Sequence, residues 1–144
     1  MSNLKQAIKQ NYVKCAKSPS YFINEFCTIQ HPQRGKIKFK LYPYQYDVLD
    51  EFEKHDYNVV LKSRQLGIST LSAAYALWMM LFHNDKNILC IATSKDTAKN
   101  LVTKVRIMYE GLPNWLKTAI VENNKLSLIF KNGSQIKAIA FNES

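Results

Sequence analysis

The amino-acid sequence predicts an α/β layered domain of the P-loop NTPase type, in which helices flank a mostly parallel sheet. Three observations predict this fold. Strand-like apolar runs alternate with helical patterns between residues 57 and 110, an order that is typical of parallel sheets covered by helices. Residues 62–70 nearly match a phosphate-binding loop. Asn132-Gly133 separates two further strand-like runs, which predicts a C-terminal β-hairpin.

Residues 1–41 are predicted to form N-terminal helices followed by an edge strand. Apolar residues over 4–16 recur at helical spacing, and Ser18-Pro19 opens a second short helix, with proline at an early helical position. Lysine alternates with apolar residues over 36–41, which predicts an edge strand whose lysines face solvent. A basic strip that touches DNA is the alternative interpretation of these lysines.

Residues 42–144 are predicted to form the P-loop NTPase core, and the whole chain is expected to be a single, partial domain. Pro43 begins a helix that runs to about His55. The β-branched run over 57–61 predicts a buried strand, and the long apolar run over 71–82 predicts a buried helix. Residues 87–92 predict a second buried strand of the parallel type.

The remainder of the core is predicted to be one amphipathic helix and the hairpin. Thr93-Ser94 caps the helix, and Gly111 ends it. One apolar stripe follows its length, formed by Ala98, Leu101, Val102, Val105 and Met108. Residues 125–130 and 134–141 are the two strands of the predicted hairpin.

Composition favours a polyanionic partner and excludes a membrane protein. The 144 residues carry a formal net charge of +9, which is typical of proteins that work on or beside nucleic acid. The longest apolar run, 71–82, is shorter than the roughly 20 residues that a membrane span needs, and no signal peptide is visible. The three cysteines have no metal-binding spacing, which predicts reduced thiols in a cytosolic protein.

The segment 62–70 carries the chemistry. In a P-loop, the backbone N–H groups of the loop and the helix N-terminus bind phosphate between a strand and a helix. Gly67 would allow close approach of phosphate, and Ser69 would ligate Mg²⁺ that bridges the phosphates of ATP. Thr70 is the less favoured metal ligand. A plain tight connection between strand and helix is the alternative interpretation.

The match to G-x-x-x-x-G-K-[ST] is partial. Lys62 occupies the position of the first glycine, and Ile68 occupies the position of the phosphate-binding lysine. Lys62 and Arg64 are the cations within this segment that could replace it. Arg64 is favoured, because a planar guanidinium group matches phosphate oxygens.

Tyr44 and Gln45 lie upstream, at the start of the predicted helix. A glutamine amide can read an adenine edge through two hydrogen bonds, and a neighbouring tyrosine can stack on the base. Packing and capping is the alternative role. The predicted nucleotide-binding residues are therefore Gln45, Ser63, Arg64, Gln65, Leu66, Gly67, Ile68, Ser69 and Thr70.

No catalytic residue is predicted. ATP hydrolysis on this fold needs a carboxylate that holds Mg²⁺ and another group that orients the attacking water. These acids normally follow an apolar strand, whereas Asp85 and Asp96 lie beside helices and Glu143 follows no such strand. The three histidines are widely spaced and predict no metal site.

The segment Lys62 to Thr70 resembles the variant Walker A loop of large terminase subunits from tailed bacteriophages, especially the T4-like group. Tyr44-Gln45 resembles the adenine-recognition element of that family. The segment from Ile88 to Asn100 resembles the next strand and helix. The resemblance covers approximately residues 42–141 and is specific in the loop and its flanks.

This resemblance implies the N-terminal part of the ATPase domain of a motor that packages viral DNA into a capsid. It implies ATP and Mg²⁺ as cofactors, and double-stranded DNA, the portal and other terminase subunits as partners. The implied location is the host cytoplasm, transiently at the procapsid portal. Because the acidic Walker B strand comes later in that family, this chain alone is expected to be inactive, with an exposed strand edge that favours self-association.

Two other functions also fit the residues. A helicase-like motor shares the upstream glutamine and the loop, but Ile68 counts against it, because such motors normally keep lysine there. A catalytically silent nucleotide- or DNA-binding module fits the missing lysine and the missing acids. The first two hypotheses describe enzymes, whereas the third describes a binding module.

Overall fold

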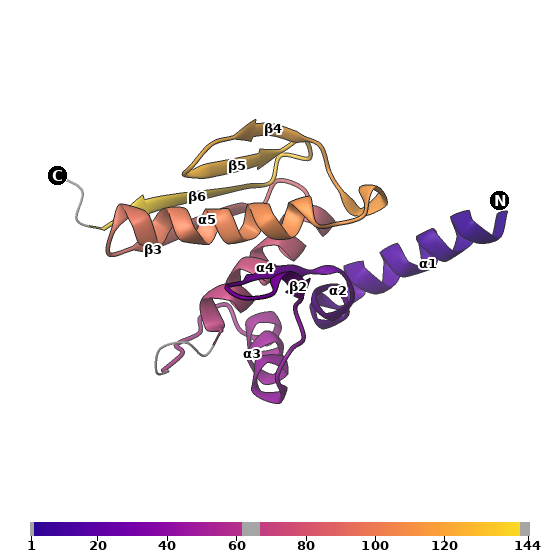
Figure 1. Ribbon diagram of the computed structural model, residues 1–144, viewed down its shortest axis with the longest axis horizontal. Helices are drawn as coiled ribbons and strands as arrows, with labels where there is room; N and C mark the ends of the chain where they lie inside the picture. Colours follow the sequence, from indigo (N-terminus) through magenta and orange to yellow (C-terminus); the bar gives the residue numbers. More distant parts are fainter. Residues whose placement is uncertain (1, 62–66, 142–144) are drawn as a thin grey trace.

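The computed structural model describes residues 2–61 and 67–141. Five helices and two sheets are described in these two ranges (Figure 1). The helices are α1 (Ser2–Lys17), α2 (Pro19–Phe26), α3 (Pro43–Lys54), α4 (Ile68–Phe82) and α5 (Lys95–Glu110), with a short 3-10 turn at Asn114–Leu116. The strands are β1 (Thr28–His31), β2 (Gly35–Lys38), β3 (Asn87–Ala92), β4 (Ile120–Asn123), β5 (Ser127–Phe130) and β6 (Gln135–Ala140).

The larger sheet is mixed, so the prediction of a mostly parallel sheet is wrong. Its strand order is β3-β6-β5-β4. β3 and β6 run parallel, whereas β6 pairs with β5 and β5 pairs with β4 in antiparallel fashion. The reason is that two successive short connections fold β4, β5 and β6 into a meander, and short connections join antiparallel neighbours.

The predicted strand over 57–61 is not formed in the structure. The segment has no regular secondary structure, and the side chains of Val59 and Leu61 are both 100% exposed. No strand within the described residues pairs with this segment or with the free edge of β3. An apolar β-branched run predicts a strand only where a neighbouring strand supplies backbone hydrogen bonds.

The small sheet at the N-terminal side is a hairpin of β1 and β2. The predicted edge strand is confirmed as β2, because Lys36 and Lys38 are exposed while Ile37 between them is partly buried. Its partner β1 was not predicted. The two strands pair antiparallel from Thr28↔Lys38 to His31↔Gly35, so the hairpin turn begins after His31.

The predicted buried helix is confirmed as α4, which lies at the centre of the core. Leu71, Leu77 and Met80 have no exposed surface, and full burial of each such side chain stabilises the fold by about 1.5–3 kcal/mol. The N-terminal helices pack on α4 through aromatic edges, since the Phe82 ring contacts the rings of Tyr12 and Phe22. The Trp78 indole N–H donates to the carbonyl of Cys15 at 2.8 Å.

The turn between β5 and β6 caps the C-terminal end of α4. The Asn132 side-chain amide donates to the carbonyls of Met80 at 2.7 Å and His83 at 3.2 Å. The Ser134 hydroxyl donates to the His83 carbonyl at 2.8 Å. The predicted hairpin is therefore confirmed, and its turn satisfies carbonyls that the helix end leaves without partners.

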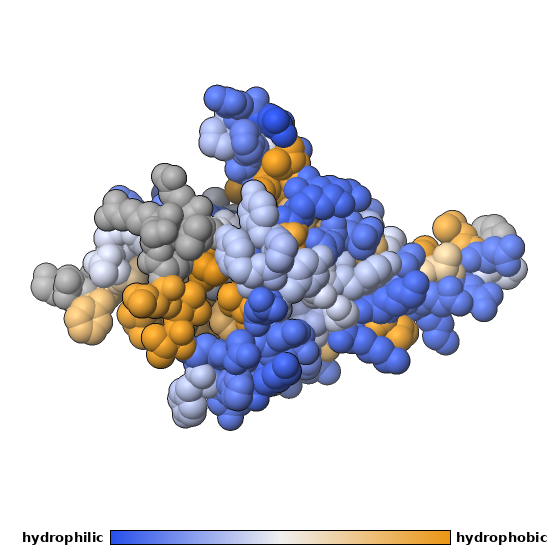
Figure 2. All heavy atoms as spheres, turned by 90° about the horizontal axis from the view of Figure 1, so that it is seen from below, coloured by the Kyte–Doolittle hydropathy of each residue, from blue (hydrophilic) through white to orange (hydrophobic). Residues whose placement is uncertain are grey.

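Helix α5 covers one face of the large sheet, and the apolar stripe predicted for it faces that sheet (Figure 1). Ala98 and Val102 pack with Ala138 of β6 and against Cys90 of β3. The side chains that alternate with these point to the opposite face, where Leu89 and Ile91 are each 58% exposed. Figure 2 shows an area of exposed hydrophobic side chains at the left of the molecule, whereas α1 at the right is mostly hydrophilic.

Candidate functional site

The candidate phosphate-binding site lies at the beginning of α4. Gly67 is the N-cap residue and adopts φ 74° and ψ 14°, the left-handed region that glycine enters without strain. Within the described residues, no side chain caps this helix end. The N–H groups of the first helical turn have no partner inside the helix, and the helix dipole adds positive potential there.

Three predicted site residues follow directly in the first turn of the helix. Ile68 begins α4, and Ser69 and Thr70 come next. The structure thus shows the helical half of the predicted phosphate-binding unit, whereas the strand predicted over residues 57–61 is not formed. The remaining predicted residues lie outside the described residues, namely Lys62, Ser63, Arg64, Gln65 and Leu66.

Gln45 connects the start of α3 with the start of α4. Its side chain is 1% exposed. Its Oε1 accepts the backbone N–H of Tyr42 at 2.8 Å, and its Nε2 lies 3.5 Å from the Gly67 carbonyl oxygen. The capping interpretation is therefore observed directly, and the same side chain supports the glycine of the candidate site. The neighbouring Tyr44 ring stacks on Tyr42 with centroids 6.0 Å apart.

A cavity of about 460 Å³ opens beside this helix end, at the carboxyl end of β3. Crevices at the carboxyl ends of parallel strands are the common ligand sites of α/β proteins. The cavity brings Ser69 together with polar side chains of the next strand and helix. It is lined by Ser69, Cys90, Ile91, Ala92, Thr93, Thr97, Asn100, Leu101 and Lys104.

A smaller cavity of about 140 Å³ also borders the first turn of α4. Thr70 and Lys104 both line it, and the rest of its wall comes from β1 and α5: Thr28, Ile29, Gln30, Ile107 and Met108. Lys104 therefore borders both cavities that flank the first turn of α4. Within residues 2–61 and 67–141, no acidic residue lines either cavity.

The thiol in the larger cavity is neutral at physiological pH. Burial raises the pKa of Cys90 above its ordinary value, so Cys90 contributes no negative charge beside Ser69. Burial also raises the pKa of Cys15 to about 12, and the charge of Glu25 adds to that effect. All three cysteines are free.

The histidines lie apart and have separate partners. His31 Nδ1 accepts the backbone N–H groups of Gln33 and Arg34. His55 Nε2 lies 3.3 Å from a Glu51 carboxylate oxygen, one turn back on α3. His83 follows α4. Within residues 2–61 and 67–141, no group of three or more potential ligands could hold a metal ion.

Sequence reasoning missed the contribution of α5 to this site. Thr97, Asn100 and Lys104 of α5 line the larger cavity, as does Thr93 just before the helix, but none was predicted to do so. A signal was available, because Lys104 is three residues after Leu101 and four before Met108, at the margin of the apolar stripe. What the sequence could not give is the packing of α5 on the start of α4.

The fold places this chain in the same structural class as a solved phage protein. The fold is similar to that of the HK97 bacteriophage large terminase, with a TM-score of 0.69 and 21% sequence identity over 90% of this chain. This chain spans 28% of the length of that terminase. At this level of identity the similarity concerns the fold, a mixed α/β domain like that in a phage large terminase.

The family follows from the sequence match. The family described as terminase large subunit, T4likevirus-type, N-terminal, matches residues 59–144. The chain therefore belongs to the family of large terminase subunits and matches their N-terminal region, as the loop resemblance implied. The matched segment contains Gly67 to Thr70, whereas Tyr44 and Gln45 lie before it. Across the described residues, no helix is long and apolar enough to cross a membrane.

Proposed function

We propose that this chain binds Mg²⁺-ATP at the start of α4 and forms part of the ATPase that powers phage DNA packaging. In the full-length protein, hydrolysis of this ATP would drive the translocation of double-stranded DNA into the capsid. Membership of the large terminase subunits supports the packaging role. The portal and other terminase subunits are the partners that this role requires.

The observation that carries the proposal is the geometry of Gly67. Its left-handed conformation turns the chain directly into α4, without a side-chain cap within the described residues. The first N–H groups of this 15-residue helix have no partner within the helix, and Ser69 of its first turn lines the adjoining cavity. The residue needed for close approach of a phosphate thus stands at the position where the family loop has its second glycine.

The residues at the start of α4 suit the binding of phosphate and of Mg²⁺, but none of them supplies the positive charge of the missing lysine. The first-turn N–H groups would hold phosphate oxygens, and Ser69 lines the cavity, where its hydroxyl would ligate Mg²⁺. Bound Mg²⁺ supplies charge neutralisation between the phosphates. Ile68 supplies neither a charge nor a donor on its side chain.

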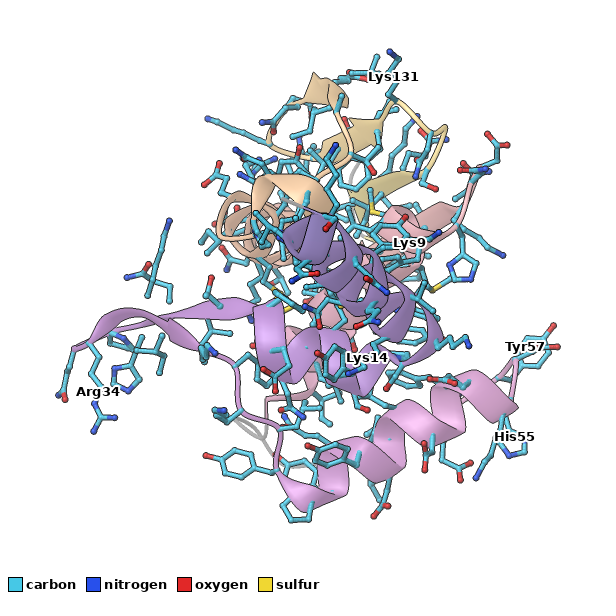
Figure 3. The ribbon with its side chains drawn as sticks, turned by 90° about the vertical axis from the view of Figure 1, so that its right-hand side faces the viewer. Lys9, Lys14, Arg34, His55, Tyr57 and Lys131 are labelled. Carbon is cyan, nitrogen blue, oxygen red and sulfur yellow. The ribbon has the colours of Figure 1, made fainter. Side chains whose placement is uncertain are left out.

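The distribution of charge fits an extended contact with DNA in the full protein rather than one compact basic patch. Figure 3 shows Lys9 and Lys14 on α1, Arg34 at the β1–β2 turn and Lys131 at the β5–β6 turn, on separate parts of the molecule. Five of the eleven acidic residues instead gather on and next to α3, at Asp47, Asp50, Glu51, Glu53 and Asp56. We therefore expect DNA to approach away from α3.

Isothermal titration calorimetry of the purified chain with Mg²⁺-ATP tests the nucleotide site. Gly67→Val is expected to abolish binding, because its side chain strains the turn and fills the space that phosphate needs. Gly35→Val is the matched control, since Gly35 also has a positive φ but lies in the β1–β2 hairpin. Equal ATP affinity in the parent and in Gly67→Val would reject the nucleotide site.

A catalytically silent binding module is the second candidate, and one observation favours it. No acidic side chain lines either cavity beside α4, so the described residues place no carboxylate where hydrolysis would need one. Such a module would bind nucleotide at the same place without turnover. Restoring activity by adding the rest of a terminase large subunit in trans would argue for the motor and against the silent module.

A further inference from the structure

The cation that position 68 lacks is supplied from another element of the fold. We propose that Lys104 of α5 binds the phosphate groups of the nucleotide at the start of α4. This inference rests on the proposed nucleotide site and deepens it, by naming a phosphate-binding side chain outside the loop.

Lys104 lies in the walls of both cavities beside the start of α4. Lys104 lines the 460 Å³ cavity together with Ser69 and lines the 140 Å³ cavity together with Thr70. It therefore stands across from both hydroxyl residues of the first turn of α4, although it lies more than thirty residues later in the chain. Helices α4 and α5 pack in one core, through Leu71 and Leu77 on one side and Val105 and Met108 on the other.

The positive charge of Lys104 has no opposite charge beside it among the described residues. The Lys104 side chain is half-buried, and within the described residues no hydrogen bond or ion pair engages its ammonium group. Among the described residues that line the two cavities, none carries an acidic side chain. Lysine is seldom withdrawn from water without a partner, and a bound polyphosphate would be the missing anion.

The side chains next to Lys104 in the larger cavity are also suited to phosphate. Thr93 and Asn100 stand in the same wall as Lys104, and both offer hydrogen-bond donors that suit phosphate oxygens. An ammonium on a flexible stem acts as a point charge and needs no fixed fork geometry. It can therefore replace the loop lysine from a different direction.

Calorimetry with three probes tests the proposal on the whole chain: Mg²⁺-ATP, AMP and inorganic tripolyphosphate. Lys104→Gln is expected to weaken ATP and tripolyphosphate binding by roughly 10- to 100-fold, the scale of a hydrogen bond to a charged group, and to change AMP binding little. Lys104→Arg should retain most of the affinity. Lys99→Gln is the control, since Lys99 lies on the same helix but lines neither cavity. Circular dichroism checks the fold of each variant.

A second measurement uses the unmodified chain. Acetylation of lysines with an activated acetate ester, read by mass spectrometry, should show Lys104 protected by saturating ATP while Lys99 stays equally reactive. Unchanged reactivity of Lys104, or equal losses of affinity in Lys104→Gln and Lys99→Gln, would overturn the assignment. If Gly67→Val abolishes ATP binding while Lys104→Gln binds as the parent does, the nucleotide site stands and only the lysine assignment fails. A parent that binds neither ATP nor tripolyphosphate rejects both.

Discussion

The side-chain amide of Gln45 occupies the space beside Gly67, so that a Cβ atom added to Gly67 would lie 3.0 Å from Gln45 Nε2. Two features of the structure therefore require glycine at position 67: the backbone has a positive φ, and the Gln45 amide leaves little space for a side chain. The start of α4 is tied in this way to the start of α3, more than twenty residues earlier.

Gly67→Ala is expected to destabilise the chain by more than Gly35→Ala does. Both glycines have positive φ, which costs an L-residue about 1–2 kcal/mol. A Cβ at Gly35 meets nothing within 4 Å, whereas a Cβ at Gly67 meets Gln45. The difference between the two free energies of unfolding, measured in urea, isolates the contact with Gln45. Equal losses would show that the Gln45 amide yields freely.

Gln45→Ala is expected to weaken the binding of Mg²⁺-ATP and inorganic tripolyphosphate by the same factor. The reason is that both ends of the buried amide support the protein itself, at Tyr42 and at Gly67. Loss of the cap and of that support should also cost about 1–3 kcal/mol of stability. If Gln45 instead reads adenine, the variant loses affinity for ATP and keeps its affinity for tripolyphosphate.

Cys90 is expected to react slowly with iodoacetamide at neutral pH and to be protected by ATP. Burial raises its pKa, so the reactive thiolate is scarcer at any given pH than in an exposed cysteine. The rate should keep rising above the pH at which an exposed thiol levels off. Cys15 and Cys27 have no exposed surface and should stay unlabelled in the native chain. Mass spectrometry of peptides reads all three, and labelling of Cys90 that ATP leaves unchanged would remove it from the site.

The isolated chain is expected not to hydrolyse ATP above the background rate. In the part of the chain that the structure describes, no carboxylate lines the two cavities beside the start of α4, and ATP hydrolysis needs one for the metal and one for the water. Phosphate release with Mg²⁺-ATP is the measurement. Turnover that Ser69→Ala abolishes would mean that a catalytic carboxylate has been overlooked.

Thr28→Val is expected to stabilise the chain by about 1 kcal/mol. Thr28 Oγ1 is buried and has no hydrogen-bond partner among the described residues, and such an unsatisfied group carries a desolvation cost of about 1–3 kcal/mol. Valine keeps the shape and suits a strand. Thr103→Val on the exposed side of α5 is the control, and thermal unfolding compares them. A destabilised Thr28→Val would point to a hydrogen bond outside the described residues.

Elements defined by their own local pattern could be predicted from the sequence. The long apolar run gave α4, and the apolar stripe from Ala98 to Met108 gave α5. Asn132-Gly133 gave the last hairpin. Elements that depend on a neighbour could not be predicted. The run over 57–61 has strand composition but no paired strand within the described residues, and β1 is specified largely by its pairing with β2.

The same division holds for the candidate site. Gly67, Ser69 and Thr70 could be proposed from the sequence because the loop pattern is contiguous. Lys104 and Thr93 could not be proposed in this way, because only the packing of α5 and β3 beside α4 brings them to the same cavity as Ser69. Gln45 was found for one role and observed in another, since a glutamine at a helix start carries the same signal for capping and for adenine recognition.

The cap that Asn132 provides for α4 also has a consequence for the order of events during translation. Asn132 lies 49 residues beyond His83, whose carbonyl it binds. At a synthesis rate of about 5–20 residues per second, several seconds therefore pass between the synthesis of α4 and the synthesis of the turn that caps its C-terminal end. During that interval the last turn of the most apolar helix must rely on water or on a chaperone, and a pause in synthesis between these two points would prolong its exposure.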